Sequence, residues 1–211
     1  MEDVLDAYHK PYDPREPLLG MDELSKQLLA HTRPRRPCRI GQVARTDYEY
    51  RRHGTRNVFV MTEPKAGKRW LQVTRRRGRQ EFAVFMKDLA DTLYPKARRI
   101  HVVLDNLNTH GEKSFLETFG ARQGRRIWRR FKFHYTPKHA SWLNVAENEI
   151  SALQKQCLNR RISSARELQQ EIHAWCRERN RQRIVIDWKF DKTKAKAKFP
   201  ALYKKTYNLS T

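Results

Sequence analysis

The short run Ile100–Leu104, which ends on Asp105, limits the fold of this chain more than any other feature. Its residues are mostly aliphatic and do not alternate with polar ones, a pattern typical of a central strand that is buried on both faces of a sheet. Such a strand needs helices on both sides, which favours an α/β fold. Because sites in these folds form at the carboxyl ends of strands, Asp105 lies where a functional site is expected.

The neighbouring segments predict a mixed sheet flanked by helices. β-branched and aromatic residues predict further strands at 17–22, 57–62, 69–74 and 131–135, with a turn at 64–67. Apolar residues at helical spacing predict helices at 82–93, 114–119, 122–130, 143–157 and around 168–175. Residues 184–186 form a short strand or an extended segment. We divide the chain into a lead-in at 1–14, one domain at 15–190 and a basic tail at 191–211.

The chain is strongly basic, with 45 Lys and Arg against 23 Asp and Glu, so that its formal net charge is +22. A surplus of this size repels itself and favours a polyanionic partner. The basic residues gather in blocks, which suit a nucleic-acid backbone because each neutralised phosphate releases counterions. The candidate DNA-binding residues are Arg75, Arg76, Arg77, Arg125, Arg126, Arg129, Arg130 and Lys138.

Other classes of protein lose their support. The longest apolar run is five residues, 82–86, far below the ~20 that a membrane helix needs. Acidic residues follow Met1, which is unlike a signal peptide. Three cysteines without a C-x-x-C motif favour neither a disulfide scaffold nor a zinc ribbon. We therefore expect a cytoplasmic protein that binds DNA and has no membrane partner.

Two acids follow apolar strands and suggest a metal site. Asp22 comes directly after residues 18–21, and Asp105 comes after Leu104. Two carboxylates on neighbouring strands repel unless a cation lies between them, and Mg²⁺ prefers oxygen ligands of this kind. A third carboxylate on the helix at 143–157 would complete a two-metal site for phosphoryl transfer. Spacing does not choose between Glu147 and Glu149, and Glu147 could instead form a capping box with Asn144.

Two stretches of sequence resemble a known family. They are VLDNLNTH at 103–110 and TPKHASWLNVAE at 136–147. The chain resembles, over roughly residues 15–190, the catalytic domain of DDE transposases, most nearly the six-thirty family of bacterial insertion sequences, which are relatives of the mariner group. The family's L-N-x-x-E pattern selects Glu147 over Glu149. The segment around Asp22 resembles the family's first acidic segment more weakly.

The resemblance implies an RNase H-like fold and metal-dependent cleavage of transposon ends, followed by strand transfer into target DNA. Asp22, Asp105 and Glu147 would be the catalytic acids and would bind two Mg²⁺ ions, or Mn²⁺ in their place. The residues expected to support these acids or to face DNA are Asn106, Asn108, His110 and Asn144. The resemblance further implies a homodimer in the active complex and a prokaryotic, nucleoid-associated protein.

Members of that family carry an N-terminal helix-turn-helix region that reads the inverted repeats, and we expect this chain to lack it. Two other functions fit the same residues. One is an RNase H-like nuclease with another substrate, such as RNA–DNA hybrids or structured DNA. The other is a catalytically idle, DNA-binding fragment of a transposase.

Overall fold

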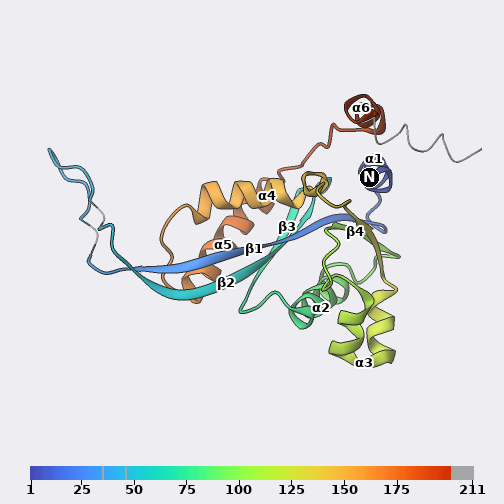
Figure 1. Ribbon diagram of the computed structural model, residues 1–211, viewed down its shortest axis with the longest axis horizontal. Helices are drawn as coiled ribbons and strands as arrows, with labels where there is room; N and C mark the ends of the chain where they lie inside the picture. Colours follow the sequence, from blue (N-terminus) through green and yellow to red (C-terminus); the bar gives the residue numbers. More distant parts are fainter. Residues whose placement is uncertain (35, 46, 201–211) are drawn as a thin grey trace, which may run out of the picture.

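The computed structural model describes residues 1–34, 36–45 and 47–200. These residues form a five-stranded mixed sheet in the order β3-β2-β1-β4-β5, as predicted (Figure 1). β1 is antiparallel to β2, which is antiparallel to β3, whereas β4 is parallel to both β1 and β5. The strands are β1 (Leu18–His31), β2 (Tyr50–Glu63), β3 (Lys68–Thr74), β4 (Ile100–Leu104) and β5 (Phe131–Tyr135).

Helices cover both faces of this sheet (Figure 1). One face packs against α2 (Arg79–Asp88), η1 (Leu89–Leu93) and α3 (Glu112–Trp128), and the other against α4 (Ala146–Leu153), η3 (Gln154–Leu158) and α5 (Ala165–Arg181). All five residues of β4 are buried, which confirms a central strand covered on both faces. The described residues include no helix that is long and apolar enough to cross a membrane.

A third cluster covers Val103, near the end of β4, and brings in residues close to both ends of the described chain. It joins α1 (Glu2–His9), η2 (Ser141–Leu143) and α6 (Lys192–Lys198), and Figure 1 shows α1 and α6 close together. Val4, Leu5 and Tyr8 of α1 pack there with Val103 and Val145. The expected lead-in and the first part of the expected tail therefore contain helices that pack on the domain.

The two longest strands extend well beyond their predicted limits. We expected strands at 17–22 and 57–62, but β1 and β2 each have 14 residues and pair with each other as far as His31 and Tyr50. The residues that β2 adds, 50–56, are largely exposed and show no apolar alternation that would reveal them. β1 does bury Leu24 and Leu28 beyond its predicted end, and the strand prediction did not include these two positions. The prediction that Asp22 ends its strand is therefore wrong, since Asp22 lies inside β1.

The two helices expected at 114–119 and 122–130 are confirmed as the two halves of α3, because the backbone of Gly120 between them, with a φ of 76°, is not helical. Other segments differ from their predicted limits. The helix expected at 143–157 is split, because Asn144 is extended between η2 and α4, and η3 follows α4. Residues 184–186 form no strand, and Ile186 instead donates its main-chain N–H to the carbonyl of Pro64.

Candidate active site

Asp22 and Asp105 lie beside each other because β1 and β4 run parallel in register. The last paired residues are Gly20 on β1 and Val103 on β4, and each acid lies two residues further along its own strand. Neighbouring strands are about 5 Å apart. Asp22 still pairs with Val60 of β2 on its other side. Asp22 therefore lies just past the point where β1 stops pairing with β4. We call this edge of the sheet, at the carboxyl end of β4, the rim of the site.

Asn144 binds β1 just beyond the last residue that pairs with β4, and it connects α4 to this rim. Its side-chain amide donates a hydrogen bond of 2.7 Å to the carbonyl of Met21, and the same nitrogen lies 3.4 Å from Oδ2 of Asp22. Its Oδ1 accepts from the main-chain N–H of Ala146 at 3.1 Å. Because Glu147 follows in the first turn of α4, Asn144 ties the helix that carries Glu147 to the strand that carries Asp22.

The pKa of Asp22 reflects the other acids near it. Burial is the main cause that raises this pKa to about 6, and the negative charges of Asp105, Glu147 and Glu23 act in the same direction. A hydrogen bond that the carboxylate accepts from the main-chain N–H of Glu23 acts in the opposite direction. The charges of the other two expected acids are therefore felt at Asp22.

Asp105 is held by His110, which is in turn held by Glu23. Nδ1 of His110 lies 2.7 Å from Oδ1 of Asp105 and 3.1 Å from its carbonyl oxygen, and Nε2 lies 2.9 Å from Oε1 of Glu23. Burial lowers the pKa of His110, but the carboxylates of Asp105 and Glu23 outweigh this and raise it to about 9. Glu23 was not among the site residues predicted from the sequence, because successive side chains of a strand point to opposite faces and Glu23 directly follows Asp22.

The donor set fits a hard divalent cation. Oδ1 of Asp105 is buried and lies 2.7 Å from Nδ1 of His110, although the N–H of that nitrogen is directed at the main-chain carbonyl of Asp105. Carboxylate oxygens that lie near other carboxylates suit Mg²⁺ or Mn²⁺. Among the residues described, however, no three His, Cys, Asp or Glu side chains form a ready-made ligand group.

Glu149, the other acid that spacing left open, has a different environment. Its carboxylate binds Arg69 at 2.8 Å and Arg179 at 3.0 Å and is almost fully buried. Burial acts to raise the pKa of Glu149, but these two guanidinium groups hold it below its ordinary value. Glu149 thus links α4 to β3 and α5, whereas Glu147 remains the acid of α4 that faces Asp22.

The remaining predicted site and DNA-binding residues differ in how exposed their side chains are. Asn106 and Asn108 are exposed in the loop after β4, and His110 and Asn144 are buried behind the acids. The exposed candidates for DNA contact are Arg75, Arg76, Arg77, Arg125, Arg126, Arg129 and Lys138. Arg130 differs, because its guanidinium donates to the carbonyls of Ala90 at 2.8 Å and Tyr94 at 2.6 Å and so closes the end of η1.

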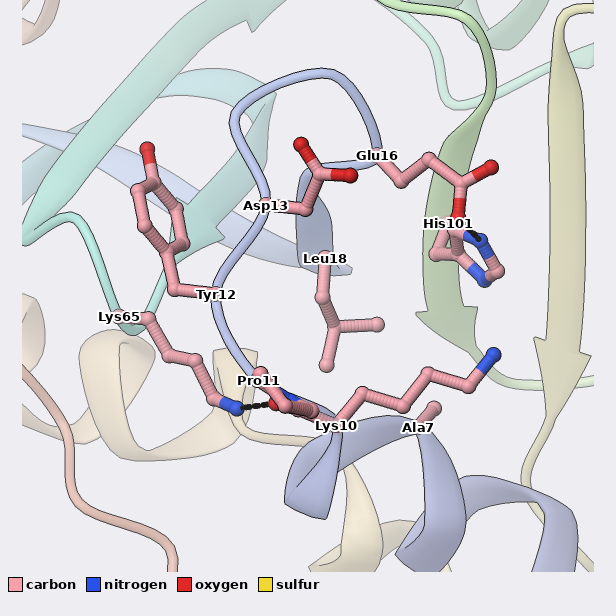
Figure 2. A pocket seen from close by; sticks show the side chains of 9 residues that line it. All are labelled: Ala7, Lys10, Pro11, Tyr12, Asp13, Glu16, Leu18, Lys65 and His101. Carbon is pink, nitrogen blue, oxygen red and sulfur yellow. Dashed lines mark hydrogen bonds and ion pairs between the residues drawn. The ribbon is translucent and has the colours of Figure 1, made fainter.

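A small pocket lies at the opposite end of the strands (Figure 2). Its lining includes Leu18 and His101, near the amino ends of β1 and β4, together with Lys10 and Tyr12. Its volume of about 50 Å³ has room for a few water molecules and not for a nucleotide. We therefore place the candidate active site at the carboxyl ends of the strands.

The sheet order, the two parallel strands that carry acids and the adjoining helix with a third acid define a domain of RNase H-like fold. The family model described as DDE superfamily endonuclease matches residues 17–169. The chain belongs to this family.

Solved structures with this fold include complexes of the Mos1 mariner transposase. The paired end complex with Mn is similar with a TM-score of 0.54 and 15% identity, over 87% of this chain and 57% of that chain. The paired-end complex with the left transposon end has a TM-score of 0.54 and 14% identity, over 90% of this chain and 63% of that chain. The strand transfer complex has a TM-score of 0.53 and 14% identity, over 91% of this chain and 62% of that chain. This chain thus spans about three-fifths of those proteins. A comparison with curated proteins gives no match.

Proposed function

We propose that this chain is the catalytic domain of an insertion-sequence transposase of the six-thirty type, which cuts DNA strands and transfers them to a target. The observation that carries the proposal is the arrangement of Asp22, Asp105 and Glu147, which β1, β4 and α4 bring to one rim of the sheet. Membership of the DDE endonuclease family supports phosphoryl transfer as the reaction class.

Asp22, Asp105 and Glu147 would hold two divalent cations, Mg²⁺ or Mn²⁺. Bound ions of this kind generate a nucleophile from water or a hydroxyl group and stabilise the leaving oxygen. The raised pKa of Asp22 supports a cation here, because a partly buried carboxylate beside other negative charges is unfavourable in its charged form unless a cation lies near it.

The remaining residues would position the acids and the DNA. His110 fixes the carboxylate of Asp105, and Asn144 fixes the start of α4 relative to Asp22. Asn106 and Asn108 are exposed beside Asp105, where the DNA strand would pass. The exposed arginines at 75–77 and 125–129 would bind the phosphate backbone, which makes the affinity dependent on salt.

Nicking of a supercoiled plasmid at low salt tests the proposal, with Mg²⁺, Mn²⁺ or EDTA. We expect nicking that needs the metal and is lost in Asp22→Asn, Asp105→Asn and Glu147→Gln, while binding of DNA is retained. The matched control is Asn148→Ala, an exposed residue of the same helix turn, which should nick normally. Full activity of Asp105→Asn would contradict the assignment of the acids.

The same assay separates the two alternative functions. A preference for an RNA–DNA hybrid over duplex DNA would indicate a nuclease with another substrate. Salt-sensitive binding without any metal-dependent cleavage would indicate an idle DNA-binding fragment. We further propose that the active form is a homodimer that acts on transposon ends and target DNA in a prokaryotic cytoplasm.

A further inference from the structure

The ribbon formed by the distal halves of β1 and β2 projects from the domain (Figure 1). We call residues 33–45 the arm tip. The pairs Arg36 with Arg45 and Arg39 with Gln42 form a narrow antiparallel ribbon. The chain reverses at Ile40 and Gly41, where Gly41 has a φ of 74°. Residues 36–45 therefore form the end of a hairpin.

The composition of the arm tip is unusual for the end of a hairpin. Its sequence holds five arginines and no acid. The side chains of Ile40 and Val43 are 106% and 76% exposed. A reversal of this kind is normally made by polar turn residues such as Asn-Gly, and two aliphatic side chains in water gain nothing for the fold of this chain. Ile40 and Val43 are therefore suited to contact with a partner.

The base of the ribbon is fixed to the domain by the segment after η3. Leu29 donates its main-chain N–H to the carbonyl of Ile162 at 2.8 Å, and Arg161 donates to the carbonyls of Tyr48 at 3.0 Å and Glu49 at 2.8 Å. A bulge between Gln27 and Leu29 increases the twist of the ribbon there. The ribbon is thus held in one direction, and its tip is presented at a fixed distance from the site.

The ribbon is long enough to reach along a duplex. β1 runs nine residues from Asp22 to His31, which is roughly 30 Å at the usual rise of a strand, and the arm tip continues beyond His31. One turn of B-DNA is about 34 Å. A duplex that crosses the carboxylates and follows the ribbon would therefore meet the reversal at Ile40 and Gly41 more than about one turn away.

We propose that the arm tip binds duplex DNA through the minor groove, with its arginines on the backbone and in the groove and with Ile40 and Val43 as an apolar wedge at a base step. Arginines that flank aliphatic wedges are how architectural proteins unstack and kink DNA. Because phosphates are the charge complement of five arginines, DNA is favoured over a second copy of this basic chain. The inference rests on the proposed function only in that the substrate is DNA.

The test measures bending of a duplex with donor and acceptor dyes at its ends and a 2-aminopurine reporter, with the full chain in EDTA so that cleavage plays no part. Ile40→Ser/Val43→Ser should reduce the dye and reporter changes several-fold, with a smaller effect on affinity. Val185→Ser, an exposed valine outside the arm tip, is the matched control and should bend DNA normally.

The charge of the arm tip is tested separately. Arg36→Ser/Arg45→Ser should lower the slope of log affinity against log salt by about 2, because each phosphate contact contributes about 0.9. DNA should also slow alkylation of Cys38, which is exposed in the arm tip, whereas Cys157 is buried.

Unchanged bending in Ile40→Ser/Val43→Ser overturns the wedge. Loss of a dimer in that variant with bending intact shows that a second copy occupies the arm tip and also overturns it. Failure of the proposed function would be seen in cleavage and not in bending, since Asp105→Asn should bend DNA normally. A chain that bends DNA but never cleaves it would support DNA binding by the arm tip and contradict the proposed transposase activity.

Discussion

Gly20 of β1 and Val145 before α4 are packed so closely that Gly20 has no room for a side chain. A Cβ on Gly20 would lie 2.3 Å from Cγ1 of Val145 and 3.1 Å from the main-chain nitrogen of Ala146. This approach allows Asn144 to reach the carbonyl of Met21 and brings Glu147 to the same rim as Asp22. The geometry of the candidate site therefore depends on a residue that takes no part in its chemistry.

Gly20→Ala should push α4 away from β1. We expect a loss of about 1–3 kcal/mol in the free energy of unfolding, as in other overpacked sites, and a larger relative loss of DNA nicking. Urea unfolding and the nicking assay measure the two effects. Gly111→Ala is the control, because a Cβ on Gly111 meets nothing within 4 Å. Equal activity of the two variants would show that this packing does not position Glu147.

Tyr8→Phe should weaken the connection between α1 and the start of α4. The hydroxyl of Tyr8 donates to the carbonyl of Leu143 at 2.9 Å and accepts from the N–H of Val145 at 3.0 Å. Its removal leaves both buried groups unpaired, which costs about 1–3 kcal/mol. Urea unfolding checks this, with the exposed Tyr48→Phe as control. A stability equal to that of the unaltered chain would mean that water replaces the hydroxyl.

Glu147→Gln and Glu149→Gln should have opposite effects on stability, although the two acids are two residues apart. Glu149→Gln leaves Arg69 and Arg179 without a negative partner, and we expect a loss of about 3–5 kcal/mol. Glu147→Gln removes a like charge near Asp22 and should leave stability within about 0.5 kcal/mol or raise it. Unfolding at pH 7 without metal compares them. A large loss in Glu147→Gln would give that residue a structural role.

Glu23→Ala should reduce cleavage through His110. Without the carboxylate at 2.9 Å, the ring of His110 loses the group that fixes it against Asp105. Groups that orient metal-binding side chains are typically worth 10–100-fold in activity or metal affinity. The metal concentration that gives half-maximal nicking should therefore rise, and Glu23→Gln should restore part of the loss. The exposed Glu112→Ala serves as control. An unchanged metal requirement would exclude this role.

The contribution of His101 to stability should fall as the pH drops from about 6.5 to about 4. Burial is the main cause that lowers the pKa of His101 to about 4, and the neighbouring His134, whose Nε2 lies 2.9 Å from Nδ1 of His101, acts in the same direction. Because the unfolded chain binds a proton at His101 in this range and the folded chain does not, this contribution is complete above pH 6.5 and decreases below it. The loss from His101 is on the order of 2–3 kcal/mol, at about 1.4 kcal/mol per pKa unit. Asp22, whose pKa is raised to about 6, acts in the opposite direction, so the effect of His101 is the difference between the unaltered chain and His101→Gln.

Urea unfolding at pH 7 and pH 5 measures this dependence. His101→Gln should remove this contribution. His139→Asn should leave it unchanged, because His139 is exposed and Asn tolerates its φ of 63°. An equally steep dependence in His101→Gln would assign the effect to other groups.

The strands and helices with a buried face could be predicted from the sequence, and those without one could not. β4, β5 and the helix α5 were expected because apolar residues mark them. The distal part of β2 was missed because its residues are exposed and pair with β1 rather than with the core. Arg161 binds the carbonyls of Tyr48 and Glu49 beside it. Glu23 was missed because alternation along β1 turns it from Asp22, and only the loop that carries His110 links it to Asp105.

The sequence by itself determined the fold class, the basic surface and the short motifs that contain Asp105 and Glu147, because these depend on composition and on local order. The family's L-N-x-x-E pattern selects Glu147, and the tertiary structure decided what Glu149 does instead, since Arg69 and Arg179 come from β3 and α5 and bind it. It also decided that Asp22 belongs to the rim, although β1 continues past it. Contacts between residues far apart in the chain are set by packing, and no local pattern encodes them.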